Sequence, residues 1–206
     1  MSGLGLWVAL AVASYLLGSI PFGLVLTKLA GLGDIRAIGS GNIGATNVLR
    51  TGKKGLAAAT LLLDGGKGAA AVLLARWLVA DELAPLIAGV LAFLGHLYPV
   101  WLGFKGGKGV ATAIGLWLAL AWPVGVGACL LWLLTAFLGR RSSLAALVAI
   151  GLTPVLAGVI ASVSYALAAL PVTLLVFWRH RGNIERLLAG TEPKIGESKQ
   201  KAENRS

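Results

Sequence analysis

Charge is scarce in this sequence, and acidic charge is scarcest of all. Charged residues make up 13% of the 206 residues, against 57% hydrophobic residues, and only 8 residues are Asp or Glu. A soluble globular domain carries about 25% charged residues. The low charge and the mean hydropathy of +0.85 therefore exclude an ordinary soluble domain and predict an integral membrane protein. At this length, one domain is the natural expectation.

The chain is also poor in cysteine, and no cleavable signal peptide is expected. Cys129 is the single cysteine and lies within an apolar run, so it forms no internal disulfide and is expected to be a small core residue. No basic region precedes the first apolar run, which is long enough to span a membrane. The sequence therefore predicts no cleavable signal peptide.

Long apolar runs take the place of charge. A transmembrane helix needs about 20 apolar residues, and five stretches stand out: Leu4–Leu26, Gly55–Val79, Leu83–Phe104, Val110–Gly139 and Leu144–Trp178. The last two are too long for one straight helix each. We expect Pro123 to break the fourth, and the segment from Gly158 to Ser164 to break the fifth. The sequence thus predicts an all-α, polytopic membrane protein of seven transmembrane helices, several of them short.

The basic residues indicate the orientation of these helices. With seven helices, the odd-numbered loops and the C-terminal tail share one side and hold 16 of the 18 Lys and Arg residues, whereas the opposite loops hold only Asp81 and Glu82. With five helices, Arg140 and Arg141 would face outward. Because cytoplasmic loops carry an excess of Lys and Arg, the pattern favours seven helices, with the N-terminus outside and the C-terminus in the cytoplasm. It also explains the net charge of +10 without a nucleic-acid partner.

The same pattern sets the expected domain boundaries. Residues 1–188 are expected to form a single transmembrane domain that would hold any catalytic site. Residues 189–206 are polar and basic and show no apolar periodicity. They are expected to form a disordered cytoplasmic tail.

Three polar segments fall on the cytoplasmic side of this topology: Gly39–Arg50, Gly95–Pro99 with Gly103–Thr112, and Arg179–Arg186. In the second, five residues open a helix: Lys105, Gly106, Gly107, Lys108 and Gly109. Glycines let backbone N–H groups turn towards a ligand, a helix N-terminus favours an anion, and lysines add charge. These five residues are therefore candidates for a phosphate cradle. The alternative is a basic loop that touches lipid head groups.

The first segment supplies hydroxyl, amide and guanidinium groups. Ser40, Asn42 and Asn47 offer the first two kinds, and Arg50 offers a fork suited to phosphate. A Gly-rich turn with Ser40 or Asn42 as the N-cap of a helix explains these residues equally well when the segment is taken alone.

The third segment holds a histidine and an asparagine on one helix face. His180 and Asn183 are three residues apart, which places their side chains together. Arg179 and Arg181 are interpreted as anchors at the membrane interface.

Three ionisable residues lie within the predicted spans. Asp64 and Lys67 are three residues apart in the second helix. Ionisable groups at this depth usually pair or function, so we interpret them as an internal ion pair. His96 is interpreted as a satisfied buried histidine.

Several familiar site types are missing. Only Asp34 offers a carboxylate in the cytoplasmic loops before the tail, which argues against a Mg²⁺ or Zn²⁺ site. A Walker A loop fits poorly for two reasons. Gly103 and Lys108 are one residue too close together, and Gly109 stands where Ser or Thr would hold Mg²⁺. The spacing from His180 to Glu185 matches the His-x4-Asp acyltransferase pair with Glu in place of Asp, but the soluble α/β domain that carries that pair is absent.

Taken in order, the three segments resemble those of the bacterial acyl-phosphate:glycerol-3-phosphate acyltransferases. The resemblance rests on Gly-Ser-Gly-Asn-Ile-Gly-Ala-Thr-Asn from residue 39, Gly-Phe-Lys-Gly-Gly-Lys-Gly-Val-Ala-Thr from residue 103 and Arg-His-Arg-x-Asn-Ile from residue 179. It runs from Gly18 to Leu187, nearly the whole chain, and no core motif departs from the pattern.

The resemblance implies a reaction and a place for it. A fatty acyl group would pass from acyl phosphate to the 1-hydroxyl of sn-glycerol 3-phosphate, which gives lysophosphatidate and phosphate in the first acylation step of phospholipid synthesis. The family is seven-helical and lies in the bacterial inner membrane, with its active site at the cytoplasmic face. The implied partners are the two phosphate substrates, membrane lipid and the enzyme that forms the acyl phosphate, with no cofactor and no metal.

The resemblance also implies roles for the candidate residues. The run from Lys105 to Gly109 would hold one phosphate, and Ser40 and Arg50 would assist. Asn42 and Asn47 would position the hydroxyl or the developing oxyanion, and His180 and Asn183 would complete the site. Either His180 or the phosphate of the acyl phosphate itself would serve as the base.

Two other functions fit the composition. A transporter or channel for an organic phosphate would also need basic loops and broken helices, although its polar residues should lie near the membrane midplane or on both sides. A non-catalytic scaffold would use its basic face to bind anionic lipid, and its Lys and Arg residues should then be interchangeable.

Overall fold

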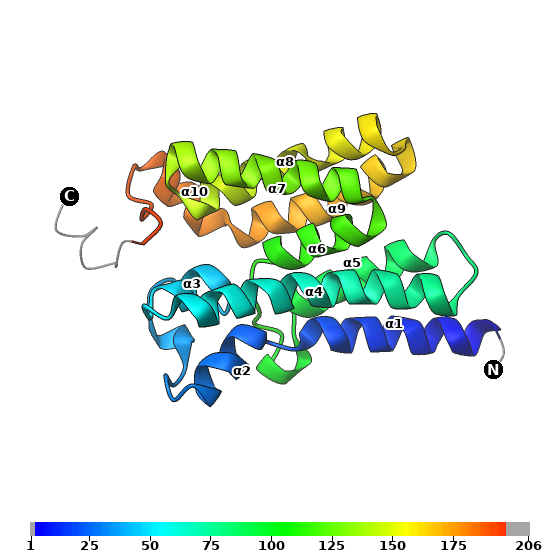
Figure 1. Cartoon of the computed structure of the whole chain (residues 1–206), viewed down its shortest axis with the longest axis horizontal. Coiled ribbons are helices and arrows are strands. Elements are labelled where there is room, and N and C mark those ends of the chain that lie inside the picture. The colour runs from blue at the N-terminus through cyan, green and yellow to red at the C-terminus, as the bar shows by residue number, and fades with distance from the viewer. Residues whose placement is uncertain (1–2, 197–206) are drawn as a thin grey trace.

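The computed structural model describes residues 3–196, and over this range the chain is all-helical (Figure 1). Its α-helices are α1 (Gly3–Ser19), α2 (Phe22–Leu29), α3 (Ala45–Leu49), α4 (Lys54–Leu78), α5 (Ala84–Leu97), α6 (Val110–Leu120), α7 (Trp122–Gly139), α8 (Ser142–Ile160), α9 (Val163–Arg179) and α10 (Arg181–Leu188). Two 3-10 turns accompany them, η1 (Ile35–Ala37) and η2 (Val100–Leu102). The predicted all-α class is confirmed.

The breaks in the long apolar runs have local causes. The fourth run breaks at Ala121, because Pro123 occupies the first turn of α7, where a missing N–H costs nothing. The fifth run breaks between α8 and α9, inside the predicted weak segment. The first run also breaks, which the sequence analysis did not predict. There Pro21 separates α1 from α2, and the two helices meet at an angle of 45°.

Within residues 3–196, four helical segments are long and apolar enough to cross a bilayer: α4, α5 with η2, α7 and α8. The bent pairs α1–α2 and α9–α10 raise this number to six if each pair counts as one span. A further apolar helix, α6, is shorter, with 11 residues. Seven spans with the N-terminus outside therefore remain a prediction.

The surface and the core have the character of a membrane protein. Large apolar side chains point outward, such as Trp77 and Phe137, which are 81% and 82% exposed. Small residues line the close helix contacts. A Cβ at Gly18 would overlap the backbone of Ala92, and a Cβ at Gly95 would overlap the carbonyl oxygen of Tyr15, so α1 and α5 touch backbone to backbone. Such packing is typical of helices in lipid.

The helices form two groups with the short α6 between them. Figure 1 shows α1, α4 and α5 side by side, and α7, α8 and α9 as a second group. Helices α3 and α10 lie at one end of the molecule, and the α4–α5 and α8–α9 turns lie at the opposite end. The polar segments between the helices therefore gather at the end that holds α3 and α10.

Candidate active site

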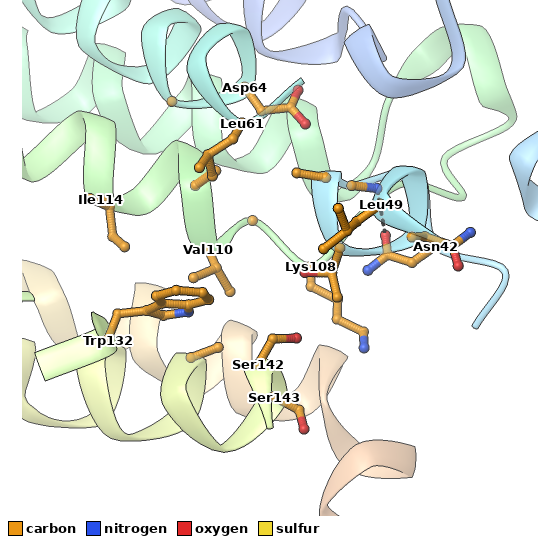
Figure 2. Close-up of a pocket in the computed structure, with 18 of the residues that line it drawn as sticks. Asn42, Leu49, Leu61, Asp64, Lys108, Val110, Ile114, Trp132, Ser142 and Ser143 are labelled. Atoms are coloured by element: carbon orange, nitrogen blue, oxygen red, sulfur yellow. Dashed lines mark hydrogen bonds between the residues drawn. The ribbon is translucent and has the colours of Figure 1, made fainter. Parts of the chain in front are cut away.

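A cavity of about 730 Å³ lies between the two groups of helices. Figure 2 shows Ile114 of α6 and Trp132 of α7 at its apolar end, and Lys108, Ser142 and Ser143 at its polar end. Other candidate residues that line it are Ser40, Asn42, Asn47, Arg50, Gly109, His180 and Asn183. The structure thus brings the three polar segments together around one space, which suits a ligand with a charged head and a hydrocarbon chain.

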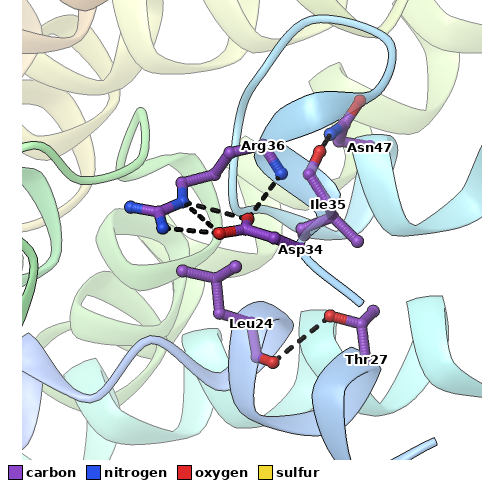
Figure 3. A network of polar contacts seen from close by, with 6 residues as sticks. All are labelled: Leu24, Thr27, Asp34, Ile35, Arg36 and Asn47. Carbon is purple, nitrogen blue, oxygen red and sulfur yellow. Dashed lines mark hydrogen bonds and ion pairs between the residues drawn. The ribbon is translucent and has the colours of Figure 1, made fainter. Parts of the chain in front are cut away.

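Asn47 organises the first segment (Figure 3). Its amide nitrogen donates to the carbonyl oxygen of Ile35 (2.8 Å), the bond that Figure 3 shows, and to that of Ile38 (3.2 Å). Its Oδ1 accepts from the backbone of Ser40 (3.1 Å) and from Arg50 (3.3 Å). The side chain is 1% exposed. Asn47 therefore shapes the loop that presents Ser40 and Arg50. To position a substrate hydroxyl or an oxyanion, it would have to give up these bonds.

Arg50 folds back across the start of the segment. Gly39 has φ +57°, and a Cβ there would overlap Oδ1 of Asn47 and the guanidinium of Arg50, so this position needs glycine for both its conformation and its lack of a side chain. Ser40 follows with an exposed side chain. Asn42 accepts a hydrogen bond from the backbone N–H of Gly44 (3.3 Å). These residues form a turn whose hydroxyl and guanidinium face the cavity.

Only part of the predicted phosphate cradle faces the cavity. Lys108 and Gly109 line it, whereas the side chain of Lys105 is exposed elsewhere. The backbone N–H groups of Gly106 and Gly107 donate to the carbonyl oxygens of Leu97 and His96, both at 3.1 Å. The glycines thus use their amides to bind the C-terminal turn of α5. The part of the run that can contact a ligand is Lys108 and the N-terminus of α6.

Arg179 closes this loop from the other side. Its guanidinium donates to the carbonyl oxygens of Gly106 (2.5 Å) and Gly107 (3.0 Å) and lies over the ring of Tyr98. The sequence pattern favours a role for Arg179 as an anchor at the membrane interface. The structure instead places it in contact with the second polar segment, because α9 ends beside that loop.

A relay of polar contacts joins the second and third segments. The ammonium of Lys108 donates to Oδ1 of Asn183, and the amide nitrogen of Asn183 donates to Oε1 of Glu192 (2.6 Å). Glu192 also accepts from Ser143 (2.7 Å) and from Arg186 (2.7 Å). Glu192 is 8% exposed. The carboxylate is thus held by three side chains from α8 and α10.

The polar end of the cavity is rich in cations. The pKa of Lys108 is lowered to about 8, mainly by burial and also by the charges of Arg186, Arg50 and Arg179, while Glu192 opposes the shift. Burial opposes ionisation of Glu192, but hydrogen bonds from Ser143, Asn183 and Arg186 lower its pKa below the usual range. One carboxylate thus faces several cations, and the excess positive charge favours an anion.

His180 is buried at the junction of α9 and α10. Its Nδ1 lies 2.8 Å from the carbonyl oxygen of Val176. A carbonyl only accepts, so Nδ1 carries the proton and Nε2 is the free acceptor. Burial and the charge of Lys108 lower the pKa of His180 to about 4. The imidazole is therefore neutral at physiological pH.

Comparisons with known proteins agree with this geometry. Residues 8–190 match the model of the family described as glycerol-3-phosphate acyltransferase. The chain belongs to the glycerol-3-phosphate acyltransferase family. A relative of that name from Ruegeria sp. (strain TM1040) is 64% identical over 183 residues, which cover 89% of this chain and 90% of the relative. Another, from Paramagnetospirillum magneticum (strain ATCC 700264 / AMB-1), is 60% identical over 192 residues, which cover 93% and 95%.

Two solved structures share the fold. Both are crystal structures of PlsY (YgiH), an integral membrane glycerol 3-phosphate acyltransferase, one in its glycerol 3-phosphate form and one in its lysophosphatidic acid form. Each is 40% identical to this chain and covers 92% of it. The chain covers 96% and 95% of the two crystal structures, with TM-scores of 0.86 and 0.84 respectively. This member of the glycerol-3-phosphate acyltransferase family is thus an integral membrane protein with a known helical fold.

Glu192 of this acyltransferase is one of the polar-end residues that the sequence did not reveal. It lies in the segment that we expected to be a disordered tail. Yet within the described part of that segment, Glu192 is buried in the polar relay, and the backbone N–H of Ile195 donates to the carbonyl oxygen of Arg140 (2.7 Å). The turn-forming Gly190 and Pro193 on either side of Glu192 were the available signal. Residues 197–206 of the predicted tail lie outside the described residues.

The buried ionisable residues of this acyltransferase lie together. Lys67 pairs with Asp64, with Nζ 3.0 Å from Oδ1, as the sequence analysis expected. His96 joins the same carboxylate, with Nδ1 3.6 Å from Oδ1. Ser142 and Ser143, at the start of α8, are further residues of the polar end that the sequence analysis did not single out.

Proposed function

We propose that this acyltransferase transfers a fatty acyl group from acyl phosphate to the 1-hydroxyl of sn-glycerol 3-phosphate, giving lysophosphatidate and phosphate. The observation that carries the proposal is the continuity of the cavity, which runs from the cations Lys108 and Arg50 to the apolar side chains Ile114 and Trp132. A phosphate head with an acyl chain needs both ends at once. A site for glycerol 3-phosphate alone would not need the apolar one.

The chemistry requires little from the protein beyond placement and charge. The glycerol hydroxyl attacks the acyl carbonyl, the bond from the acyl carbon to the phosphate oxygen breaks, and phosphate leaves. Phosphate is a good leaving group, so no protein nucleophile is needed. Orientation of the two substrates and neutralisation of their charge supply the rate enhancement. Lys108, Arg50 and Ser40 bind phosphate oxygens in this scheme, and Asn42 assists the hydroxyl or the oxyanion.

The hydroxyl proton goes to an oxygen of the acyl phosphate's own phosphate. His180 has a free Nε2 but a pKa of about 4, which makes it a weak base near neutral pH. Its neutral ring, with Asn183, orients the groups around Lys108. Because the polar end lies with the basic loops, we place it at the cytoplasmic face of the bacterial inner membrane. There glycerol 3-phosphate arrives from water, and the acyl chain arrives from the bilayer or from the enzyme that forms acyl phosphate.

The donor is tested with purified protein in detergent. We expect lysophosphatidate from glycerol 3-phosphate with acyl phosphate, and none with acyl-CoA in a parallel reaction. Product from acyl-CoA at an equal rate would overturn the choice of donor. Flux of glycerol 3-phosphate into proteoliposomes without acyl transfer would favour a transporter instead.

A further inference from the structure

Three buried ionisable side chains form a second cluster, and two of them, Asp64 and His96, also line the cavity. Asp64, Lys67 and His96 are 2%, 3% and 4% exposed. Lys67 and His96 approach the same oxygen of Asp64. Lys67 also donates to the carbonyl oxygen of Ile20 (2.8 Å) and lies near the ring of Phe22. The cluster therefore ties α4 to the break between α1 and α2, and to the last turn of α5.

His96 is the point where this cluster meets the loop before α6. Its carbonyl oxygen accepts from the backbone N–H of Gly107 (3.1 Å). Its ring occupies the place where a side chain of Gly107 would lie, because a Cβ there would overlap Nε2. The backbone of Gly107 is not in the left-handed region. The ring of His96, and not the backbone conformation, is therefore what demands glycine at position 107.

The loop is held from both sides. His96 lies against one side of Gly107, and Arg179 binds the carbonyl oxygens of Gly106 and Gly107. The next residue is Lys108, whose ammonium reaches Asn183. Asp64 and His96 line the same cavity as Lys108, and Figure 2 shows Asp64 on α4, apart from the loop that carries Lys108. The cluster reaches the backbone of this loop through His96.

We propose that His96, which lies beside the Asp64–Lys67 ion pair, is a positioning residue for Lys108. The thickness of its ring sets how closely the loop approaches α5, and therefore where the ammonium of Lys108 stands in the cavity. This inference rests on the proposed function, because the position of Lys108 matters through its bond to a substrate phosphate.

The test uses the full chain in detergent with acyl phosphate and varied glycerol 3-phosphate. Gly107→Ala should raise KM for glycerol 3-phosphate at least about tenfold, the worth of one hydrogen bond to a charged group, with a smaller change in kcat. His96→Asn removes Nε2 and Cε1 but keeps a polar group beside Asp64. In the double variant, which combines Gly107→Ala with His96→Asn, the KM for glycerol 3-phosphate should therefore return close to the value of His96→Asn alone, because Nε2 and Cε1 no longer obstruct the new Cβ.

Gly106→Ala provides the matched control. A Cβ at Gly106 would overlap the backbone carbonyl oxygen of His96 and the ring of Pro99, and His96→Asn removes neither. The KM for glycerol 3-phosphate should therefore stay raised when His96→Asn is added to Gly106→Ala. Thermal unfolding is measured for every variant to test whether each is folded. If His96→Asn fails to fold, His96→Ala offers the same comparison, because Lys67 still pairs with Asp64.

Three outcomes would overturn the inference: a normal KM in Gly107→Ala, a KM that stays high in the double variant, or equal rescue of both glycine variants. Equal rescue would mean that His96→Asn merely loosens the loop. A wild-type chain without acyl transfer from acyl phosphate would instead overturn the proposed function, so the two failures are distinguishable.

Discussion

Lys108 and Asn183 lie 75 residues apart in the chain, and a hydrogen bond joins the lysine ammonium to the asparagine amide oxygen. Because the ammonium only donates, this bond fixes the amide so that its nitrogen points to Glu192 (2.6 Å). The protonation state of Lys108 is thus linked to the orientation of Asn183 and to the charge of Glu192.

The activity should depend on the protonation of Lys108. The pKa of Lys108 is lowered to about 8, so the group carries its charge below this pH and loses it above. We expect kcat/KM for glycerol 3-phosphate to fall as the pH rises through about 8, because a neutral amine binds phosphate weakly. Lys108→Ala should cost roughly tenfold or more at neutral pH.

Lys108→Arg is the control for that basic limb. Its guanidinium stays charged at every pH used, so the limb should disappear even if the absolute rate is lower. Measurement of kcat/KM from pH 6 to 10 in both proteins decides the matter. A basic limb near pH 8 that persists in Lys108→Arg would mean that another group titrates.

His180 should be dispensable as a base. Its pKa is lowered to about 4, so the ring is already neutral above that pH and its titration produces no acidic limb near 6.5. His180→Gln and His180→Asn keep a polar group and should retain measurable turnover, more than His180→Ala. The prediction fails if all three variants are equally dead and the wild-type kcat falls with an acidic limb that tracks a histidine.

Glu192 should stabilise both the fold and the charge of Lys108. Glu192→Ala removes three hydrogen bonds to a buried carboxylate, each worth about 1.5–3 kcal/mol, so the melting temperature should fall by about 10 °C or more. Glu192→Gln removes only the charge. Since Glu192 raises the pKa of Lys108, the basic limb of this variant should move to lower pH.

The matched control is Glu185→Gln, on the exposed side of α10. This substitution also removes one carboxylate but should leave both the melting temperature and the limb unchanged. Equal shifts in both variants would assign the effect to net charge and not to the contacts of Glu192.

Activity should not require a divalent metal. Lys108 and Arg50 line the polar end of the cavity and can neutralise phosphate charge themselves, and Glu192 is already bound by three protein side chains. We expect full turnover in EDTA at constant ionic strength. Complete loss in EDTA, restored by Mg²⁺ and not by salt, would contradict this.

The seven-span orientation can be tested by cysteine labelling in a Cys129→Ala background. A cysteine at Asp81 should react with an impermeant reagent from outside the cell, and one at Arg141 should react only after the membrane is opened. Reaction of position 141 from outside would exclude the seven-helix arrangement.

The sequence by itself determined the class of this protein and the identity of its polar segments. Hydropathy and the positions of Pro123 and of the weak segment from Gly158 to Ser164 are local properties, so the all-α membrane class and two of the helix breaks were predictable. The segments around Ser40, Lys108 and His180 were also visible as local patterns of glycine and polar residues.

The tertiary structure alone decided how those segments are used. Glu192 accepts a hydrogen bond from Ser143, 49 residues away in the chain. Local sequence periodicity does not reveal a contact between residues so far apart, so the segment of Glu192 resembled a polar tail. The sequence pattern suggests that Gly107 is a ligand-binding glycine, but in the structure the ring of His96 occupies the space that a side chain at this position would need. A glycine in a sequence motif indicates that another group approaches the backbone closely at that position. Only the packing of α5 against the loop shows that the close neighbour is another side chain of the same chain.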